Sequence, residues 1–200
     1  MPQLSRIGLT TLTFVVLCLG HAASTQADTI AFTGSRTTVN NPPPSLNDAR
    51  CGSVPNLLVT PNTGTGTSNL GAFTTQERFC VNPLTMMVSS GDFRFDFANG
   101  STLLGTIGGS VQPTVNGIQP VSFIFNVTGG SGLFAGATGS LMANGQVMFL
   151  PGGLSNSTVN FTGTITTVPE PTTMLLLATG LAGVATKVRK RRKADKSEEV

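Results

Sequence analysis

The stretch "GDFRFDFANGSTLLGTI", residues 91–107, contains the clearest structural signal in the chain. Aromatic and charged side chains alternate along its first half: Phe93, Arg94, Phe95, Asp96 and Phe97. An alternation with a period of two is typical of a strand that buries one face. The pair Asn99-Gly100 follows, and both residues tolerate the positive φ angles of a tight hairpin turn. The stretch therefore predicts a β-hairpin whose second strand is "STLLGTIGGSV", residues 101–111.

The same pattern recurs on both sides of this hairpin. Further strands are predicted at "TIAFTGS", "LGAFTTQERFCV", "PVSFIFNVTGG" and "STVNFTGTIT", which begin at residues 29, 70, 120 and 157. A second Asn-Gly pair, Asn144-Gly145, predicts another turn. We expect roughly seven to nine strands and no helix in this part of the chain. The predicted fold class is all-β, an antiparallel meander that forms a barrel or a sandwich.

Charge is distributed unevenly along the chain. The net charge is +3, but residues 28–168 contain four basic and five acidic residues, a net charge of −1. The basic residues of this part are all arginines: Arg36, Arg50, Arg78 and Arg94. Nucleic-acid binding needs many basic side chains on a folded face. We therefore expect no nucleic-acid partner.

The first 27 residues have the pattern of a secretory signal peptide. Arg6 is followed by the apolar stretch "IGLTTLTFVVLCLG" and by "HAASTQA", which is rich in small residues. Signal peptidase is expected to cleave after Ala27. The alternative is an N-terminal membrane anchor, which the shortness of the apolar stretch disfavours.

The C-terminal segment combines three features in a fixed order. Pro169, Glu170 and Pro171 end the preceding strand, and an apolar run follows. The run predicts a short transmembrane helix over residues 172–188 that barely spans a bilayer. A basic cluster comes next: Arg189, Lys190, Arg191, Arg192 and Lys193. Such clusters stay on the cytoplasmic side, so the domain over residues 28–168 is expected to face outward.

Together these features, residues 169–200, resemble the PEP-CTERM sorting signal of Gram-negative bacteria. The resemblance implies processing near the motif by an exosortase, a membrane-embedded cysteine protease-like transpeptidase. It also implies an inner-membrane precursor that is then released or transferred to the cell surface, often alongside exopolysaccharide. The alternative is a plain single-pass membrane anchor.

A second, shorter stretch carries another resemblance. The run "TGGSGLFAGATGS", residues 128–140, follows a Phe-rich strand and is similar to a phrase of the allene oxide cyclase and dirigent barrels. The resemblance covers about residues 90–165. It implies an eight-stranded up-and-down barrel with a lipophilic interior. The simpler interpretation is that these glycines serve turns and bulges of any β domain.

Few residues are suited to catalysis or metal binding. The only histidine, His21, lies in the leader, and two cysteines remain after it. Zinc sites and nucleophilic triads with histidine are therefore not expected, and neither is a cofactor. Asp92 and Asp96 share a strand face but lie roughly 13 Å apart, beyond the ~5–9.5 Å of glycosidase pairs. With Arg94 between them, they are interpreted as a solvated ladder rather than a catalytic pair.

The two remaining cysteines lie in two parts of the domain that differ in composition. Residues 28–69 open with a short strand and are then rich in Pro, Asn, Gly and Thr, which predicts an irregular segment. Residues 70–168 are rich in hairpin signals. Cys51 and Cys80 are predicted to form a disulfide in an oxidising compartment. The alternative is two separate buried thiols.

Two functional hypotheses follow. The first is a non-enzymatic protein of the cell surface or extracellular matrix, whose hydroxyl-rich strands contact exopolysaccharide. The second is a barrel that binds or isomerises a small lipophilic molecule, with Glu77, Arg78 and Arg94 as the polar groups that orient it. Ligand cavities usually exceed about 300 Å³, so the interior volume distinguishes the two hypotheses.

Overall fold

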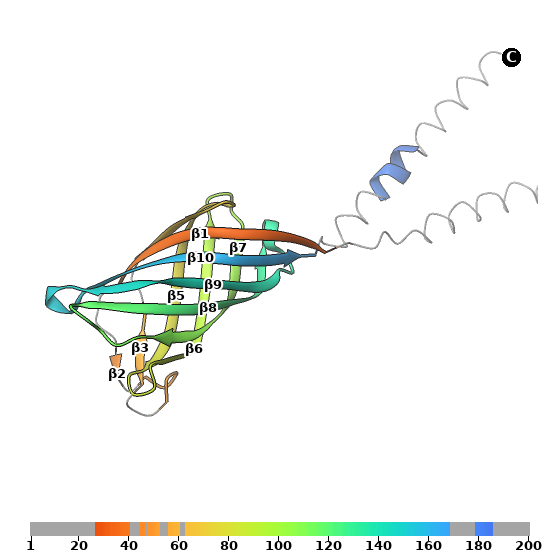
Figure 1. Cartoon of the computed structure of the whole chain (residues 1–200). Helices are drawn as coiled ribbons and strands as arrows, with labels where there is room; N and C mark the ends of the chain where they lie inside the picture. Colours follow the sequence, from red (N-terminus) through yellow and green to blue (C-terminus); the bar gives the residue numbers. More distant parts are fainter. Residues whose placement is uncertain are drawn as a thin grey trace, which may run out of the picture.

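The fold is an antiparallel β-barrel (Figure 1). The computed structural model describes residues 27–40, 45–46, 48–52, 56–60, 63–168 and 179–185. Within these ranges the strands are β1 Asp28–Asn40, β2 Ser45–Leu46, β3 Leu57–Val59, β4 Thr63–Ser68, β5 Gly71–Asn82, β6 Met87–Phe97, β7 Thr102–Val111, β8 Ile118–Ser131, β9 Thr138–Phe149 and β10 Ser155–Thr167.

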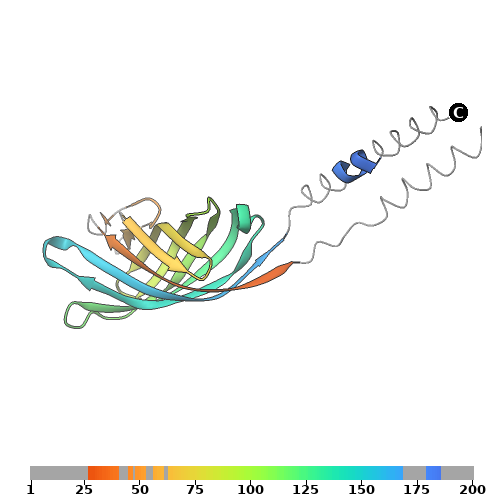
Figure 2. The same ribbon diagram turned by 90° about the horizontal axis from the view of Figure 1, so that it is seen from above.

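Eight of these strands close the barrel in an up-and-down order. Each of β4 to β9 pairs with the next strand along the chain, β10 pairs with β1, and β1 pairs with β4. β3 pairs with the last part of β5, at Phe79–Val81, and β2 pairs with β3. Figure 2 shows how strongly the sheet curves. The all-β meander is confirmed, and it forms a barrel rather than a sandwich.

The predicted alternation positions the core. Phe93, Phe95 and Phe97 of β6 are buried, and Arg94 between them is exposed. Gly100 has φ +83° in the turn between β6 and β7, as the Asn-Gly signal predicts. β8 repeats the pattern, because Phe123 and the other alternate residues of this strand point inward. The barrel interior is therefore dominated by phenylalanine.

Two parts of the N-terminal segment are more regular than expected. β1 continues to Asn40, and "TGTGTS" forms β4, although residues 28–69 were predicted to be irregular after a short opening strand. Both pieces are stabilised by ladders to partner strands distant in sequence, since β1 pairs with β10 over its whole length. Composition alone does not report such long-range pairing.

The second Asn-Gly prediction is wrong. Asn144 and Gly145 lie in the middle of β9, and the chain reverses instead at the 3-10 turn Pro151–Gly153. A Cβ atom at Gly145 would collide with the carbonyl oxygen of Thr158 on β10. This glycine therefore permits a close approach of two strands rather than a turn.

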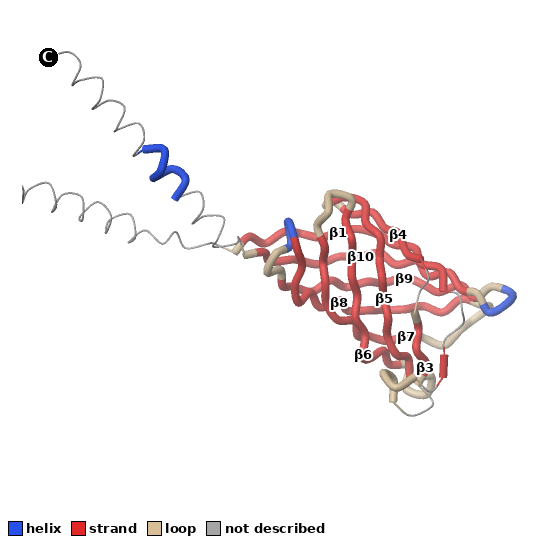
Figure 3. Tube along the Cα trace, turned by 180° about the vertical axis from the view of Figure 1, so that it is seen from behind, coloured by secondary structure: helices blue, strands red, loops and turns tan. Residues whose placement is uncertain are grey.

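The barrel has two distinct ends. At one end, which we call the tail rim, the first residue of β1 pairs with the last residue of β10, Asp28 with Thr167. At the other end, which we call the mouth, Asn40 pairs with Ser155. Figure 3 shows the 3-10 turn Pro151–Gly153 at the mouth, away from the tail rim. Both terminal segments of the chain therefore leave from the tail rim.

The predicted transmembrane helix, residues 172–188, lies mostly outside the described residues. Residues 179–185 are helical. Among the residues that the structure describes, no helix combines the length and the apolar character needed to cross a bilayer. The membrane span therefore remains a prediction from the sequence.

Candidate functional site

A cavity of about 210 Å³ lies inside the barrel at the mouth. Six of the apolar residues that line it come from four strands: Leu57, Val59, Phe79, Val121, Phe123 and Val147. Most of its polar wall comes from β1 and β10: Arg36, Thr38, Asn40, Ser155 and Ser157. These polar residues point inward because they continue the alternation that buries Phe32 and Phe161 on the same strands. The cavity thus has one apolar side and one side that can form hydrogen bonds.

A buried ion pair forms the base of the polar wall. Arg36 Nη2 donates to Glu77 Oε2 at 2.6 Å, and both side chains are almost completely shielded from solvent. Arg36 Nη1 donates to Thr38 Oγ1 at 3.1 Å and to Ser157 Oγ at 3.3 Å. Thr75 Oγ1 donates to Glu77 Oε1 at 2.9 Å. The pair is therefore embedded in a network that joins β1, β5 and β10.

Burial makes both charges of this pair costly. It raises the pKa of Glu77 above its usual range, and the contacts with Arg36 and Thr75 only partly oppose the rise. Burial also lowers the pKa of the Arg36 guanidinium, against the attraction of Glu77. Replacement of such pairs by apolar residues is often neutral or stabilising. The network is therefore a poor candidate for a purely stabilising element.

Two buried polar atoms at the site have no hydrogen-bond partner within the described part of the chain. They are Arg36 Nε and Asn40 Oδ1. Their residues are only 2% and 7% exposed, so solvent does not readily reach them. The amide nitrogen of Asn40 donates to Ser155 Oγ at 3.0 Å, which fixes this side chain in place. An unpaired buried donor or acceptor costs about 1–3 kcal/mol.

Residues 48–52 and 56–60, which we call the strap, carry part of the apolar wall. The predicted disulfide between Cys51 and Cys80 is present, with 5.5 Å between the Cα atoms. Arg50 adds an ion pair to Asp92 at 2.5 Å and a hydrogen bond to the carbonyl oxygen of Ser90 at 2.8 Å. These contacts hold the strap against β5 and β6, where its strand β3 presents Leu57 and Val59 to the cavity.

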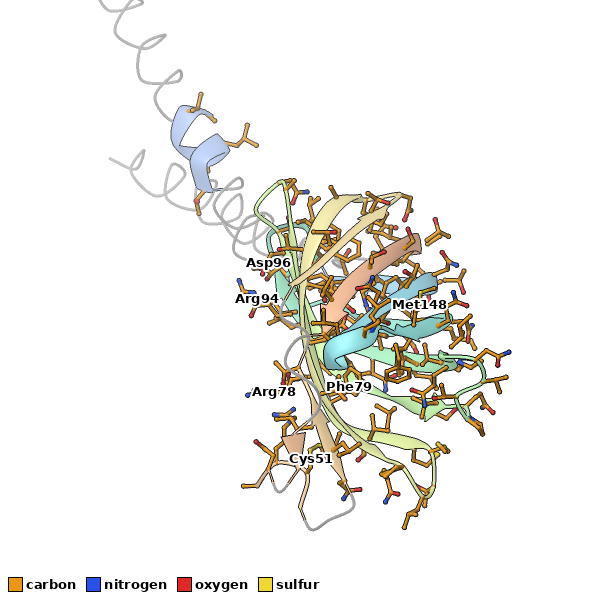
Figure 4. The ribbon with its side chains drawn as sticks, turned by 90° about the vertical axis from the view of Figure 1, so that its left-hand side faces the viewer. Cys51, Arg78, Phe79, Arg94, Asp96 and Met148 are labelled. Carbon is orange, nitrogen blue, oxygen red and sulfur yellow. A yellow bond between two sulfur atoms is a disulfide. The ribbon has the colours of Figure 1, made fainter. Side chains whose placement is uncertain are left out.

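The charged residues of β5 and β6 divide between the two faces of the wall. Glu77 points inward, as the ligand-binding hypothesis requires, but Arg78 and Arg94 are 52% and 51% exposed. Figure 4, which looks toward the mouth, shows Arg78, Arg94 and Asp96 on the outer side of the wall. The expectation that Arg78 and Arg94 orient a ligand inside the barrel is therefore wrong. Arg36 occupies that place.

The predicted Asp-Arg-Asp ladder is present only in part. Arg94 Nε donates to Asp96 Oδ1 at 2.7 Å on the outer face. Asp92 turns to other partners, Arg50 and, at 3.6 Å, Arg78. The two aspartates are thus engaged with different arginines, and they do not face each other as a catalytic pair must.

Another part of the outer face lies on β5, β4, β1, β10, β9 and β8. It carries rows of uncharged polar side chains that run across these strands. In one row, residues that pair across five neighbouring strands are all exposed: Thr74, Thr65, Thr37, Thr158 and Gln146. The next row contains Thr67, Ser35, Asn160, Asn144 and Ser122. We call these two rows the polar rungs. The hydroxyls of Thr37 and Thr158 lie 3.3 Å apart.

The chemistry of the described residues is limited to binding groups at these places. Within the described ranges no three His, Cys, Asp or Glu side chains gather in an arrangement that could hold a metal ion. Glu77 pairs with Arg36 of the cavity wall, and both of its oxygens accept hydrogen bonds from the protein. The arrangement can therefore orient a bound molecule.

The residues of the two terminal signals fall largely outside the described residues. Ala27, the expected cleavage point, is exposed and directly precedes β1. The motif Pro169, Glu170 and Pro171 lies outside the described residues, and so does the basic cluster: Arg189, Lys190, Arg191, Arg192 and Lys193.

Comparison with known families identifies the C-terminal segment. Residues 167–192 match the family model described as the PEP-CTERM protein-sorting motif. The match begins at Thr167, the last residue of β10, so the motif follows the barrel without an intervening strand. No curated protein and no solved structure matches the chain in the same comparisons. The motif indicates an exported protein that is processed by exosortase.

Proposed function

We propose that this chain is a non-enzymatic component of the cell surface or extracellular matrix and that it works together with exopolysaccharide. The leader directs the chain out of the cytoplasm, signal peptidase cleaves after Ala27, and exosortase removes the tail near Pro169–Pro171. The barrel is the product that remains outside. The observation that carries this proposal is the match of residues 167–192 to the sorting motif directly after β10.

The arrangement of the barrel supports this sequence of events. Both terminal segments leave from the tail rim, where Asp28 pairs with Thr167. Cleavage at both ends therefore removes nothing from the paired strands of the barrel. The disulfide between Cys51 and Cys80 agrees with an oxidising compartment outside the cytoplasm.

The polar rungs support contact with polysaccharide. They present hydroxyl and amide groups at the spacing of neighbouring strands, about 4.8 Å, without any charged residue among them. Such groups replace the hydrogen bonds that a neutral sugar makes with water. Individual contacts of this kind are weak, which suits a matrix component that binds a long polymer at many points.

The export part of the proposal is tested by intact-mass measurement of the secreted product. Secretion should yield a chain that starts at Asp28, lacks the basic cluster Arg189–Lys193 and gains 2 Da on reduction. Replacement of all three residues of Pro169–Pro171 by alanine should leave the tail attached. The matched control is P113A, which removes a proline from a loop of the barrel. A secreted product that retains its arginine cluster contradicts the proposal.

The polysaccharide part is tested by co-sedimentation with the cell's own exopolysaccharide. Thr158→Glu places a charge in the centre of a polar rung and should reduce the bound fraction several-fold. Thr106→Glu makes the same change at an exposed position of β7, outside the polar rungs, and should leave binding unchanged. Equal binding by both variants rules out the polar rungs as the contact surface.

The alternative, a barrel that isomerises a lipophilic molecule, has less support. The cavity of about 210 Å³ is smaller than the roughly 300–1,000 Å³ of ordinary ligand sites. Two of the three polar residues expected to orient such a ligand, Arg78 and Arg94, are exposed. A smaller ligand remains compatible with the cavity.

A further inference from the structure

We propose that the mouth of the barrel is a binding site for a small, uncharged amphipathic molecule, whose hydroxyl or primary amide head lies against the polar wall formed by Arg36, Thr38 and Asn40. This site is independent of the polar rungs, which lie on the outer face of the same barrel. It also differs from the ligand-binding hypothesis drawn from the sequence, since different residues hold the head group.

The head group is defined by the two unpartnered atoms. Arg36 Nε is a donor and needs an acceptor, whereas Asn40 Oδ1 is an acceptor and needs a donor. A hydroxyl or a primary amide can pair with either atom, because each of these groups carries both a donor and an acceptor. Both residues line the same cavity, and both come from the inward face of β1. A ligand of this kind completes a network whose other members already have partners.

The charge of the head group follows from the buried ion pair. Glu77 neutralises Arg36 at 2.6 Å, so the site has no net positive charge to offer an anion. A carboxylate would lie near Glu77, and it has no proton to donate to Asn40 Oδ1. An ammonium group would lie near Arg36 and has no lone pair to accept from Nε. Both charged forms should therefore bind more weakly than the neutral one.

The volume of the cavity limits the size of the molecule. An engineered cavity of about 150 Å³ holds benzene, which has six non-hydrogen atoms. By the same proportion, the cavity of about 210 Å³ holds roughly eight. Leu57, Val121, Phe123 and Val147 provide an apolar lining for the body of the molecule. A straight-chain alcohol such as 1-heptanol has the required size and polarity.

The position of the cavity suits a protein whose tail is processed at a membrane. The mouth lies at the end of the barrel opposite the tail rim, from which the sorting segment leaves. Removal of the tail therefore takes away none of the residues that line the cavity. One part of its wall, β3, belongs to the strap that the disulfide fixes, so the site is complete only in the oxidised protein.

Calorimetric titration of the full-length oxidised protein tests the proposal with three probes of equal chain length: 1-heptanol, heptanoate and heptylamine. We expect saturable binding of one 1-heptanol per chain and at least tenfold weaker binding of the two charged probes. Absence of saturable 1-heptanol binding overturns the proposal and means that the site holds only water. Equal affinity for heptanoate overturns it as well.

Two matched variants locate the binding site. Val147→Phe fills the cavity from a partly buried position of β9 and should abolish 1-heptanol binding. Val39→Phe adds the same volume on the outer face near the mouth, where the side chain is 39% exposed, and should leave binding unchanged. Asn40→Leu should reduce the affinity for 1-heptanol at least fivefold. Binding that survives Val147→Phe places the alcohol elsewhere and refutes the assignment. The comparison of the three probes uses the unmodified protein, so it does not depend on the folding of any variant.

Discussion

The tail rim and the mouth are two ends of one barrel, but their interiors are filled in different ways. Toward the tail rim, rings from five strands pack against one another: Phe32, Phe73, Phe95, Phe125 and Phe161. Toward the mouth, the same strand β1 contributes Arg36, Thr38 and Asn40 around a cavity. The first arrangement maximises apolar burial, whereas the second places charges and unpaired polar atoms where they are costly.

We infer from this difference that the end near the tail rim stabilises the barrel, whereas the mouth is available for binding. Each aromatic pair of this kind contributes about 0.5–1.5 kcal/mol beyond the burial of its apolar area. The mouth tolerates a destabilising polar network because the other end compensates for it. We infer that the network is retained for recognition, and the following predictions test that inference.

Removal of an aromatic ring from the packed end should have the largest effect. Phe95 is fully buried and packs against four other rings, with Phe73 nearest at 4.7 Å between centroids. Phe95→Ala should lower the free energy of unfolding by about 3–5 kcal/mol, because it leaves a cavity in a close-packed region. Denaturant unfolding measures the change. The control Val147→Ala, at the mouth, should cost clearly less, and an equal loss at both places removes the distinction between the ends.

A break in the buried ion pair should have the next largest effect. Glu77→Gln leaves the Arg36 guanidinium buried without a counter-charge and should cost about 3 kcal/mol. Asp96→Asn breaks the exposed pair with Arg94 and should cost at most about 1 kcal/mol. Both changes are measured by the same denaturant titration. Similar losses for the two variants argue against strong burial of the Arg36–Glu77 pair.

Loss of the disulfide should destabilise the strap more than the rest of the barrel. The bridge closes a sequence separation of 29 residues, and its removal by Cys51→Ala with Cys80→Ala should cost about 2–4 kcal/mol. Hydrogen exchange should increase first in residues 48–60 and in the adjacent part of β5. Uniform exchange over all strands would contradict a local role for the bridge.

The sequence predicts the packed end better than the mouth. The alternation of Phe93, Phe95 and Phe97 identifies a strand and its buried face without any other information. The sequence does not single out Arg36, because the predicted first strand "TIAFTGS" ends at Ser35, although the positions from Phe32 to Asn40 continue the same period of two. Followed further, that period places Arg36 inside the barrel.

Two other features depend on contacts that local sequence does not report. β4 is recognised only through its pairing with β1 and β5, since "TGTGTS" contains no large apolar residue. Gly145 resembles part of a turn, but its role is the close approach of β10. Both the closure of the barrel and the cavity arise from long-range pairing, whereas the sorting segment is local and was therefore predictable from its order of residues.

The pH dependence of stability should show the smallest of these effects. Burial raises the pKa of Glu77 in the folded state above its ordinary value of 4.5. Above that pH the unfolded chain has released a proton that the folded protein still holds, so stability falls as pH rises through this window. The slope is at most about 1.4 kcal/mol per pH unit. The lowered pKa of Arg36 has the opposite sign, because the folded protein then releases this proton at a lower pH than the unfolded chain does.

Comparison of the wild type with Glu77→Gln isolates this contribution, because other titrating groups are common to both proteins. The stability advantage of the wild type should decrease as pH rises from about 4.5 toward neutrality. An advantage that grows over the same range indicates that Arg36 outweighs burial at Glu77. In that case the pair stabilises the fold, and the contrast between the two ends is weaker than we infer.

The most direct test of the contrast is the free energy of unfolding of the double variant Arg36→Met with Glu77→Met. Apolar replacement of both partners removes two buried charges and leaves neither one unpaired. We predict a stability equal to that of the wild type or higher by about 1–4 kcal/mol, together with loss of 1-heptanol binding. A large loss of stability would contradict the account, because it would show that the polar mouth holds the barrel together.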